Sequence, residues 1–328
     1  MKYLIVDDEA ELYKQMYHDL FLYENIKKYN IEEIERMRIP RILMPIYRLH
    51  FNQRINFRIF IPFKGIWTSC YQLHKYKFDS NEKYCVIFLN GTLREHFSKK
   101  YLEKLKREHE NIKLVMILYD SFSNPNAKRA IDMIPIFDTV FSFDKGDCEK
   151  HGFEYIYSTF SKPDFVKKDS NYYSSAFFVG FAQGRLKILK NTFKRITERI
   201  KNCKFIIAGV HENEKENIKD VIYNKTISYK EELQYAYNTD CIVEIIRDGQ
   251  TGVSLRTCEA ICFNKKLLTN NKKIKEMPFY DERYIHVFEN AEKIDLDFLE
   301  NDIVVKYDKN DFFSPINIVK RLNEIYAE

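Results

Sequence analysis

The sequence has 328 residues, of which 45% are hydrophobic and 31% charged, a composition that excludes disordered and collagen-like chains. Its length exceeds that of one typical hydrophobic core and predicts two domains. The formal net charge of +5 is too small to indicate nucleic-acid binding by itself.

The chain begins with a short apolar strand, Tyr3 to Val6, followed by the acidic residues Asp7, Asp8 and Glu9. This beginning is not a signal peptide, and no apolar run reaches membrane-spanning length, so a cytoplasmic protein is expected. The start also looks like a phosphoacceptor receiver domain of response regulators. Such a domain needs an acidic residue further along, where this chain has Tyr47 to His50, so a receiver is kept only as an alternative.

A basic and aromatic segment follows, with no acidic residue between Glu35 and Asp79. Such a surface could attract anionic lipid headgroups or a lipid-linked acceptor, or bind single-stranded nucleic acid by stacking. Alternatively its aromatic side chains belong to the core, because Arg54 to Pro62 alternates like a half-buried strand. The candidate surface residues are Arg38, Arg41, Arg48 and Trp67.

Buried strands then alternate with helices, which is typical of a doubly wound parallel sheet. The first domain, residues 1–165, is expected to contain strands at Tyr84 to Leu89, Lys113 to Tyr119 and Val140 to Phe143, and a helix from Thr92 to His109. Asp8 and Asp120 follow strands, and they are the candidates for a catalytic base.

A polar linker from Ser161 to Asn171 precedes the second domain, residues 172–313, and a closing helix in residues 314–328 could pack back on the first domain. The expected elements of the second domain are strands at 176–179, 204–209, 241–246, 267–269 and 284–288, and helices at 185–201, 229–238 and 253–263.

The stretch from Cys241 to Asn271 predicts a strand, a glycine-containing turn, a helix and another strand. A helix that starts after such a turn presents free N–H groups and the positive end of its dipole, so a phosphate is the expected ligand. The predicted phosphate contacts are Gln250, Thr251, Gly252, Ser254 and Arg256, whereas Glu259, further along the helix, suits ribose hydroxyls.

The segments Gly252 to Ala260 and Asn264 to Asn271 resemble the nucleotide-sugar half of GT-B-type glycosyltransferases that build bacterial capsule or lipopolysaccharide. The resemblance implies two facing Rossmann-like domains with a cleft between them. It places Glu259 on the ribose, the turn from Gln250 to Ser254 at the diphosphate, and further donor contacts at Gly180, Gly184, Arg185 and His211. Many retaining members carry a second Glu where Thr251 stands here, so retention and inversion both remain open.

The sequence therefore predicts a glycosyltransferase that moves a sugar from a nucleotide-diphosphate sugar, with a UDP-sugar favoured, to a saccharide or lipid-linked acceptor. No metal and no cofactor are expected, and contact with the inner face of the membrane is possible. Seven cysteines at scattered apolar positions are typical of reduced core thiols. Two alternatives are a nucleotide-sugar epimerase of the same architecture and a non-enzymatic protein that binds membranes or nucleic acids.

Overall fold

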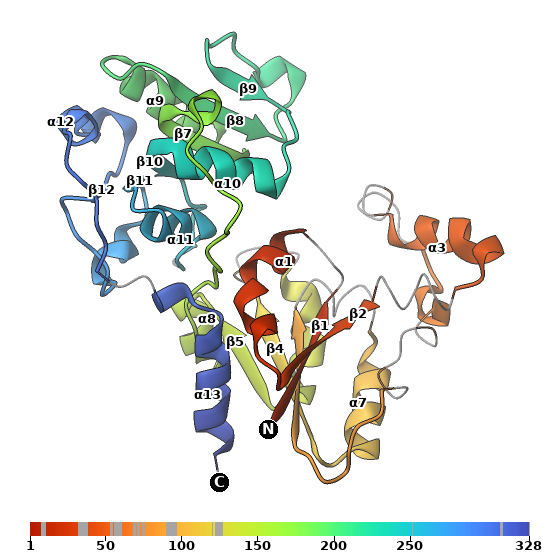
Figure 1. The fold of residues 1–328 in the computed structure, drawn as a ribbon. Helices are drawn as coiled ribbons and strands as arrows, with labels where there is room; N and C mark the ends of the chain where they lie inside the picture. Colours follow the sequence, from red (N-terminus) through yellow and green to blue (C-terminus); the bar gives the residue numbers. More distant parts are fainter. Residues whose placement is uncertain are drawn as a thin grey trace. The chain divides into compact units, whose positions relative to one another are not determined.

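The computed structural model describes residues 1–7, 11–31, 39–52, 55, 61–67, 70, 73, 76–89, 97–119, 121, 127–250, 252–308 and 311–327. Residue contacts divide the chain into two compact units (Figure 1). The first unit contains Met1–Ile156 and Ile318–Glu328, and the second contains Tyr157–Asn317. The predicted linker from Ser161 to Asn171 thus lies inside the second unit, because Phe160, Phe165 and Val166 pack in its core.

The first unit is built on a six-stranded sheet in which every described pairing is parallel. The strand order is β2-β1-β3-β4-β5-β6, so the chain reverses its winding direction between β1 and β3. The strands are β1 (Lys2–Asp7), β2 (Ile26–Asn30), β3 (Tyr84–Leu89), β4 (Ile112–Leu118), β5 (Thr139–Ser142) and β6 (Glu154–Tyr155).

One apolar face of this sheet packs against α7, through a cluster that includes Val86, Leu102 and Met116. The last helix, α13, also belongs to this unit and is fastened to β5 and β6 by polar contacts. Thr139 and Tyr326 share a hydrogen bond of 2.6 Å, and Arg321 lies 2.8 Å from the Glu154 carboxylate. The α-helices are α1 (Glu11–Met16), α3 (Met44–Phe51), α7 (Lys99–Glu108), α8 (Lys145–His151) and α13 (Ile316–Tyr326).

The second unit contains another six-stranded parallel sheet, ordered β12-β11-β10-β7-β8-β9. Numbered within the unit this is 6-5-4-1-2-3, the strand order of a Rossmann fold, with its switch point between β7 and β10. The strands are β7 (Ser174–Phe181), β8 (Cys203–Ala208), β9 (Val221–Tyr223), β10 (Thr239–Glu244), β11 (Lys266–Thr269) and β12 (Ile285–Val287).

Alternate residues of these strands cover opposite faces of the sheet, as the period of a β-strand requires. Phe178 and Val243 pack on the side of α9, whereas Ile242 packs on the side of α11. The helices are α9 (Leu186–Thr197), α10 (Tyr229–Asn238), α11 (Leu255–Cys262) and α12 (Leu296–Glu300).

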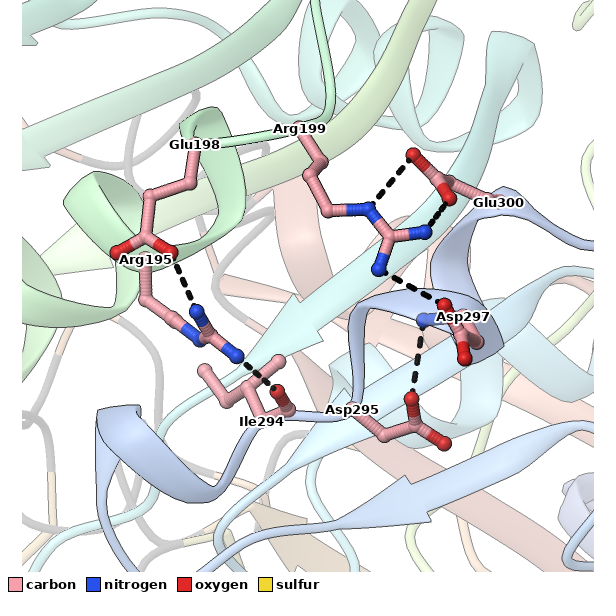
Figure 2. A network of polar contacts seen from close by, with 7 residues as sticks. All are labelled: Arg195, Glu198, Arg199, Ile294, Asp295, Asp297 and Glu300. Atoms are coloured by element: carbon pink, nitrogen blue, oxygen red, sulfur yellow. Dashed lines mark hydrogen bonds and ion pairs between the residues drawn. The ribbon is translucent and has the colours of Figure 1, made fainter.

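A polar network joins the end of α9 to α12 (Figure 2). The guanidinium of Arg199 holds both oxygens of Glu300 and lies 2.8 Å from Asp297. Asp295 caps α12 by accepting from the N–H of Asp297 at 2.9 Å. Because these charged groups are exposed, the network mainly positions α12 and contributes little to stability.

Short 3-10 helices connect the main elements of both units. They are η1 (His18–Leu22), η2 (Arg41–Leu43), η3 (Lys64–Trp67), η5 (Ala127–Ile136), η6 (Ser170–Tyr172), η7 (Glu212–Glu214), η8 (Lys272–Glu276), η9 (Ala291–Lys293) and η10 (Asp311–Phe313). Among the described residues, no helix is long and apolar enough to cross a membrane.

The predicted α/β class with two Rossmann-like parallel sheets is confirmed. Two boundaries are corrected. The helix expected from Thr92 begins at Lys99, where Ser98 accepts from the N–H of Tyr101 at 3.3 Å. Strand β7 continues through Gly180, which was expected in the following turn. The strand expected from Arg54 to Pro62 falls largely outside the described residues.

Candidate functional site

The carboxyl ends of β7, β10, β11 and β12 border a pocket of about 560 Å³ in the second unit. In doubly wound sheets, ligands bind at this edge, beside the switch point. The pocket is lined by Gln183, Gly184, Arg185, Lys187, Ile188, Asn191, Ile246, Arg247, Asp248, Asn270, Glu289, Asn290, Ala291 and Glu292.

Arg185 joins the two strands that flank the switch point. It stands at the N-cap of α9, and its guanidinium donates to main-chain carbonyls of Phe181 and Ala182 after β7 and of Ile245 after β10. Burial, with the nearby charge of Arg247, lowers the pKa of Arg185 to about 10. The positive charge at this strand edge is therefore held in place by backbone dipoles.

The pocket lining carries both signs of charge together with amide groups. Arg185, Lys187 and Arg247 supply cations, Asn191 and Asn290 supply amides, and carboxylates come from Asp248, Glu289 and Glu292. Guanidinium groups recognise phosphate oxygens through paired hydrogen bonds. Within this mixed lining, the two guanidiniums near the ends of β7 and β10 are the groups that suit phosphates.

The loop after β10 is closed by a buried carboxylate. Glu244, the last residue of β10, accepts from the hydroxyls of Ser254, Thr257 at 2.8 Å and Thr269 at 2.5 Å. Ser254 caps α11 by accepting from the N–H of Arg256 at 3.1 Å. Because Glu244 and Ser254 bound the loop that carries Arg247 and Asp248, their contact fixes both ends of that loop.

The predicted pair Arg256 and Glu259 is brought together, but inside the protein. Glu259 is fully buried and accepts from Arg256 and from the hydroxyl of Tyr229 at 3.2 Å. Arg256 also forms an ion pair with Glu232 on α10. Burial raises the pKa of the Glu259 carboxyl, while Arg256 opposes that rise. In this arrangement the pair joins α10 to α11 and lies outside the lining of the pocket.

The other predicted donor contacts are dispersed. Gly184 lines the pocket with a left-handed φ of 82°, whereas Gly180 lies within β7. His211 is exposed after β8, Gln250 closes a turn onto Arg247, and the carbonyl of Gly252 accepts from Asn271 at 3.4 Å. Thr251 lies outside the described residues.

Of the predicted site residues of the first domain, some lie outside the part of the chain that the structure describes, some are exposed and one is buried. Asp8, Asp120 and Arg38 lie outside the described residues. Arg41 and Arg48 are exposed on η2 and α3. Trp67 is a correction, because it is 4% exposed and donates to the ring of His50 at 2.6 Å, so it belongs to the core rather than to a binding surface.

Sequence reasoning missed most of the pocket lining. Arg247 could have been found, because it follows β10 by three residues and precedes the turn that was singled out. Lys187, Asn191 and Asn290 carry no local signal, since they meet only when α9 and the segment after β12 fold onto one sheet edge. Among the described residues, no group of three or more His, Cys, Asp or Glu side chains could hold a metal ion.

Comparison with known proteins identifies the fold by structure alone. No protein-family model matches the chain, and no curated protein matches it. A structure of S. aureus MnaA with UDP has a TM-score of 0.54 at 11% identity, and covers 100% of this chain and 97% of its own. UDP-GlcNAc 2-epimerase from Neisseria meningitidis with UDP-GlcNAc has a TM-score of 0.53 at 11% identity, covering 99% and 100%. Anabaena HepE with UDP-glucose has a TM-score of 0.52 at 11% identity, covering 100% and 99%.

These matches overturn the prediction of a glycosyltransferase for surface polysaccharide. Several of the similar solved structures, at 11–12% identity, are named as UDP-GlcNAc 2-epimerases. The reason for the error lies in the motif: a glycine turn followed by a helix with Arg and Glu occurs in a Rossmann-like half whatever reaction the whole protein performs.

Proposed function

We propose that this protein is a nucleotide-sugar epimerase that binds a UDP-sugar at the pocket of its second unit. The observation that carries the proposal is the position of Arg185 and Arg247 at the Rossmann switch point, in a fold whose solved examples hold UDP or UDP-sugars. The two matches extend over 97% and 100% of those chains, so they include both units of this protein.

The diphosphate is proposed to lie against Arg185 and Arg247, at the ends of β7 and β10. Arg185 is held by three main-chain carbonyls, so binding would cost it little conformational freedom. Arg247 sits on the loop that Glu244 and Ser254 close. A dianionic group is expected to gain most from two guanidiniums that are already positioned.

Removal of the proton from one face of C2 leaves an electron pair, which can form a C1–C2 double bond while UDP leaves C1. Return of the proton to the other face and of UDP to C1 completes the inversion, so the enzyme needs positioned acid and base groups. Asp8 and Asp120 remain the proposed carboxylates for this step, since they follow β1 and β4 in the sequence. No bound cofactor or metal is proposed, because proton transfer to and from carbon can be carried out by side chains alone.

The proposed binding of UDP is tested by calorimetric titration with UDP, GDP and CMP. Arg247→Met and Arg185→Met are each expected to weaken UDP binding at least about tenfold, as the loss of a charged hydrogen bond to phosphate implies. Lys306→Met, an exposed cation of the same unit away from the pocket, serves as the control. If both arginine variants bind UDP with unchanged affinity, this pocket is not the UDP site.

The proposed epimerase reaction is tested by proton NMR of UDP-GlcNAc incubated with the protein in D₂O. The expected result is a second set of sugar signals from the C2 epimer, with deuterium at the inverted carbon of the product. Asp8→Asn and Asp120→Asn are expected to slow this conversion while leaving UDP affinity unchanged. Tight UDP binding with neither an epimer nor deuterium uptake would refute the epimerase and retain the nucleotide site.

A further inference from the structure

The first unit carries an exposed apolar surface that no described element covers, and we define it as the α3 surface. It consists of Ile42, Leu43, Ile46, Leu49, Phe63 and Ile66. The side chains of Ile42 and Phe63 are 84% and 78% exposed, which leaves most of their apolar surface in contact with solvent. Several exposed apolar side chains on neighbouring elements are typical of a site of interaction.

Helix α3 is apolar on two opposite sides. Tyr47 is buried, and Met44 packs against the same core cluster. Ile42, Ile46 and Leu49 follow the i, i+4, i+7 spacing of the opposite side and remain exposed. One side thus anchors the helix to the core, and the second apolar side, as far as the described residues show, is exposed.

Helix η3 extends the same surface. The ring of Trp67 contacts Tyr47 at a centroid distance of 5.4 Å and the indole donates to His50, so η3 packs directly against α3. Phe63, just before η3, has a left-handed φ of 66°, a conformation that bulky residues rarely adopt. The backbone at Phe63 therefore carries strain while its ring stays in solvent, which is a combination found at functional sites.

The Lys, Arg, Asp and Glu side chains described between residues 39 and 67 are all cations. Arg41 and Arg48 are exposed beside the apolar residues, and the sequence contains no Asp or Glu between Glu35 and Asp79. A basic rim around aliphatic and aromatic side chains complements a bilayer with anionic headgroups, which attracts the cations and accepts the apolar groups.

We propose that the α3 surface docks the protein on an anionic lipid bilayer. A symmetric pair of chains joined through this surface would bring Arg41 and Arg48 of both copies into one interface, and these like charges disfavour self-association there. Single-stranded nucleic acid binds by stacking on exposed rings. Of the exposed large hydrophobic side chains described between residues 39 and 67, Phe63 alone is aromatic, so nucleic acid is a poorer fit.

The experiment is vesicle flotation of the full chain, with phosphatidylcholine vesicles that contain either no anionic lipid or about 30 mol% phosphatidylserine. Binding is expected only to the anionic vesicles. Ile46→Gln combined with Leu49→Gln is expected to lower the partition coefficient about tenfold, because two side chains no longer enter the interface. Arg41→Gln combined with Arg48→Gln is expected to lower binding and to reduce its dependence on salt.

Val304→Gln is the matched control, because Val304 is 84% exposed in the second unit, and its partition should equal that of the wild type. UDP affinity and melting temperature should be the same in all variants, since the changed side chains are exposed. Three results would overturn the proposal: equal binding to neutral and anionic vesicles, binding of a single-stranded oligonucleotide without vesicle binding, or a dimer that Ile46→Gln and Leu49→Gln dissociate.

Discussion

Arg256 and Glu259 lie one turn apart on α11, and the guanidinium of Arg256 donates to the buried carboxylate of Glu259. Arg256 is also paired with Glu232, so one cation neutralises two carboxylates at the contact between α10 and α11. This relationship turns two residues that sequence reasoning placed on a ligand into a link between two helices.

Arg256→Met is expected to destabilise the second unit by about 3–5 kcal/mol, because it leaves the Glu259 charge buried beside Tyr229 alone. Urea unfolding measures the loss. Arg283→Met, which breaks an exposed pair with Asp281, should cost less than about 1 kcal/mol. If Arg256→Met instead leaves stability unchanged and abolishes UDP binding, Arg256 does not stabilise the contact between α10 and α11 but contacts the ligand, as the sequence predicted.

Ser254→Ala removes the cap of α11 and the contact that closes the loop after β10. A loss of about 1 kcal/mol in unfolding free energy is expected, together with weaker UDP binding. Ser228→Ala removes the equivalent cap of α10, where Ser228 accepts from the N–H of Glu231 at 3.1 Å, away from the pocket. It should cost similar stability and leave UDP binding unchanged. Calorimetry on both variants separates the two effects, and equal loss of binding would contradict the role of the loop.

Arg185→Lys keeps the charge but loses the planar fork that reaches carbonyls after both β7 and β10. We expect a loss of about 1 kcal/mol in unfolding free energy, since the partly buried carbonyls of Ala182 and Ile245 lose their donor. Thermal unfolding provides the measurement. Lys187→Arg, which changes another cation of the same pocket without such bonds to break, should leave the melting temperature unchanged.

Lys265 makes the stability of the protein depend on pH, and the direction of this dependence follows from the pKa of its side chain. Burial, with the charge of Lys168, lowers the pKa of Lys265 from 10.5 to about 8. Between about pH 8 and 10.5 the unfolded chain binds more protons than the folded one, so the contribution of this residue to stability rises with pH. The rise amounts to at most about 3 kcal/mol.

Lys265→Met should remove this rise in stability with pH. The variant should exceed the wild type in unfolding free energy by the largest margin at pH 7, where Lys265 is charged and buried. Denaturant midpoints at pH 7 and pH 10 provide the comparison, with Lys306→Met as an exposed control. A stability difference between wild type and Lys265→Met that does not change with pH would contradict the assignment.

Much of the fold could be predicted because buried parallel strands read as apolar runs. Tyr84 to Leu89 and the helix Tyr229 to Asn238 with its Ser228 cap are found at their predicted bounds. The missed strand β2, Ile26–Asn30, contains two lysines because it lies at the edge of its sheet, where the apolar signal is weak. The two-residue β6 is too short for any periodicity.

The candidate site was harder to predict than the fold. Gly184 and Arg185, which the resemblance proposed as donor contacts, do line the pocket. The exposure of Arg256 and Glu259 depends instead on whether Tyr229 and Glu232 of α10 pack over them, which a pattern on α11 alone does not contain. Trp67 was misplaced for the same reason, since its burial depends on Tyr47 and His50.

The assignment of α13 to the first unit has a consequence for synthesis on the ribosome. The second unit is one continuous segment, residues 157–317, whereas the first unit combines residues from both ends of the chain. The contacts of α13 with β5 and β6 can therefore form only after the whole second unit has been translated.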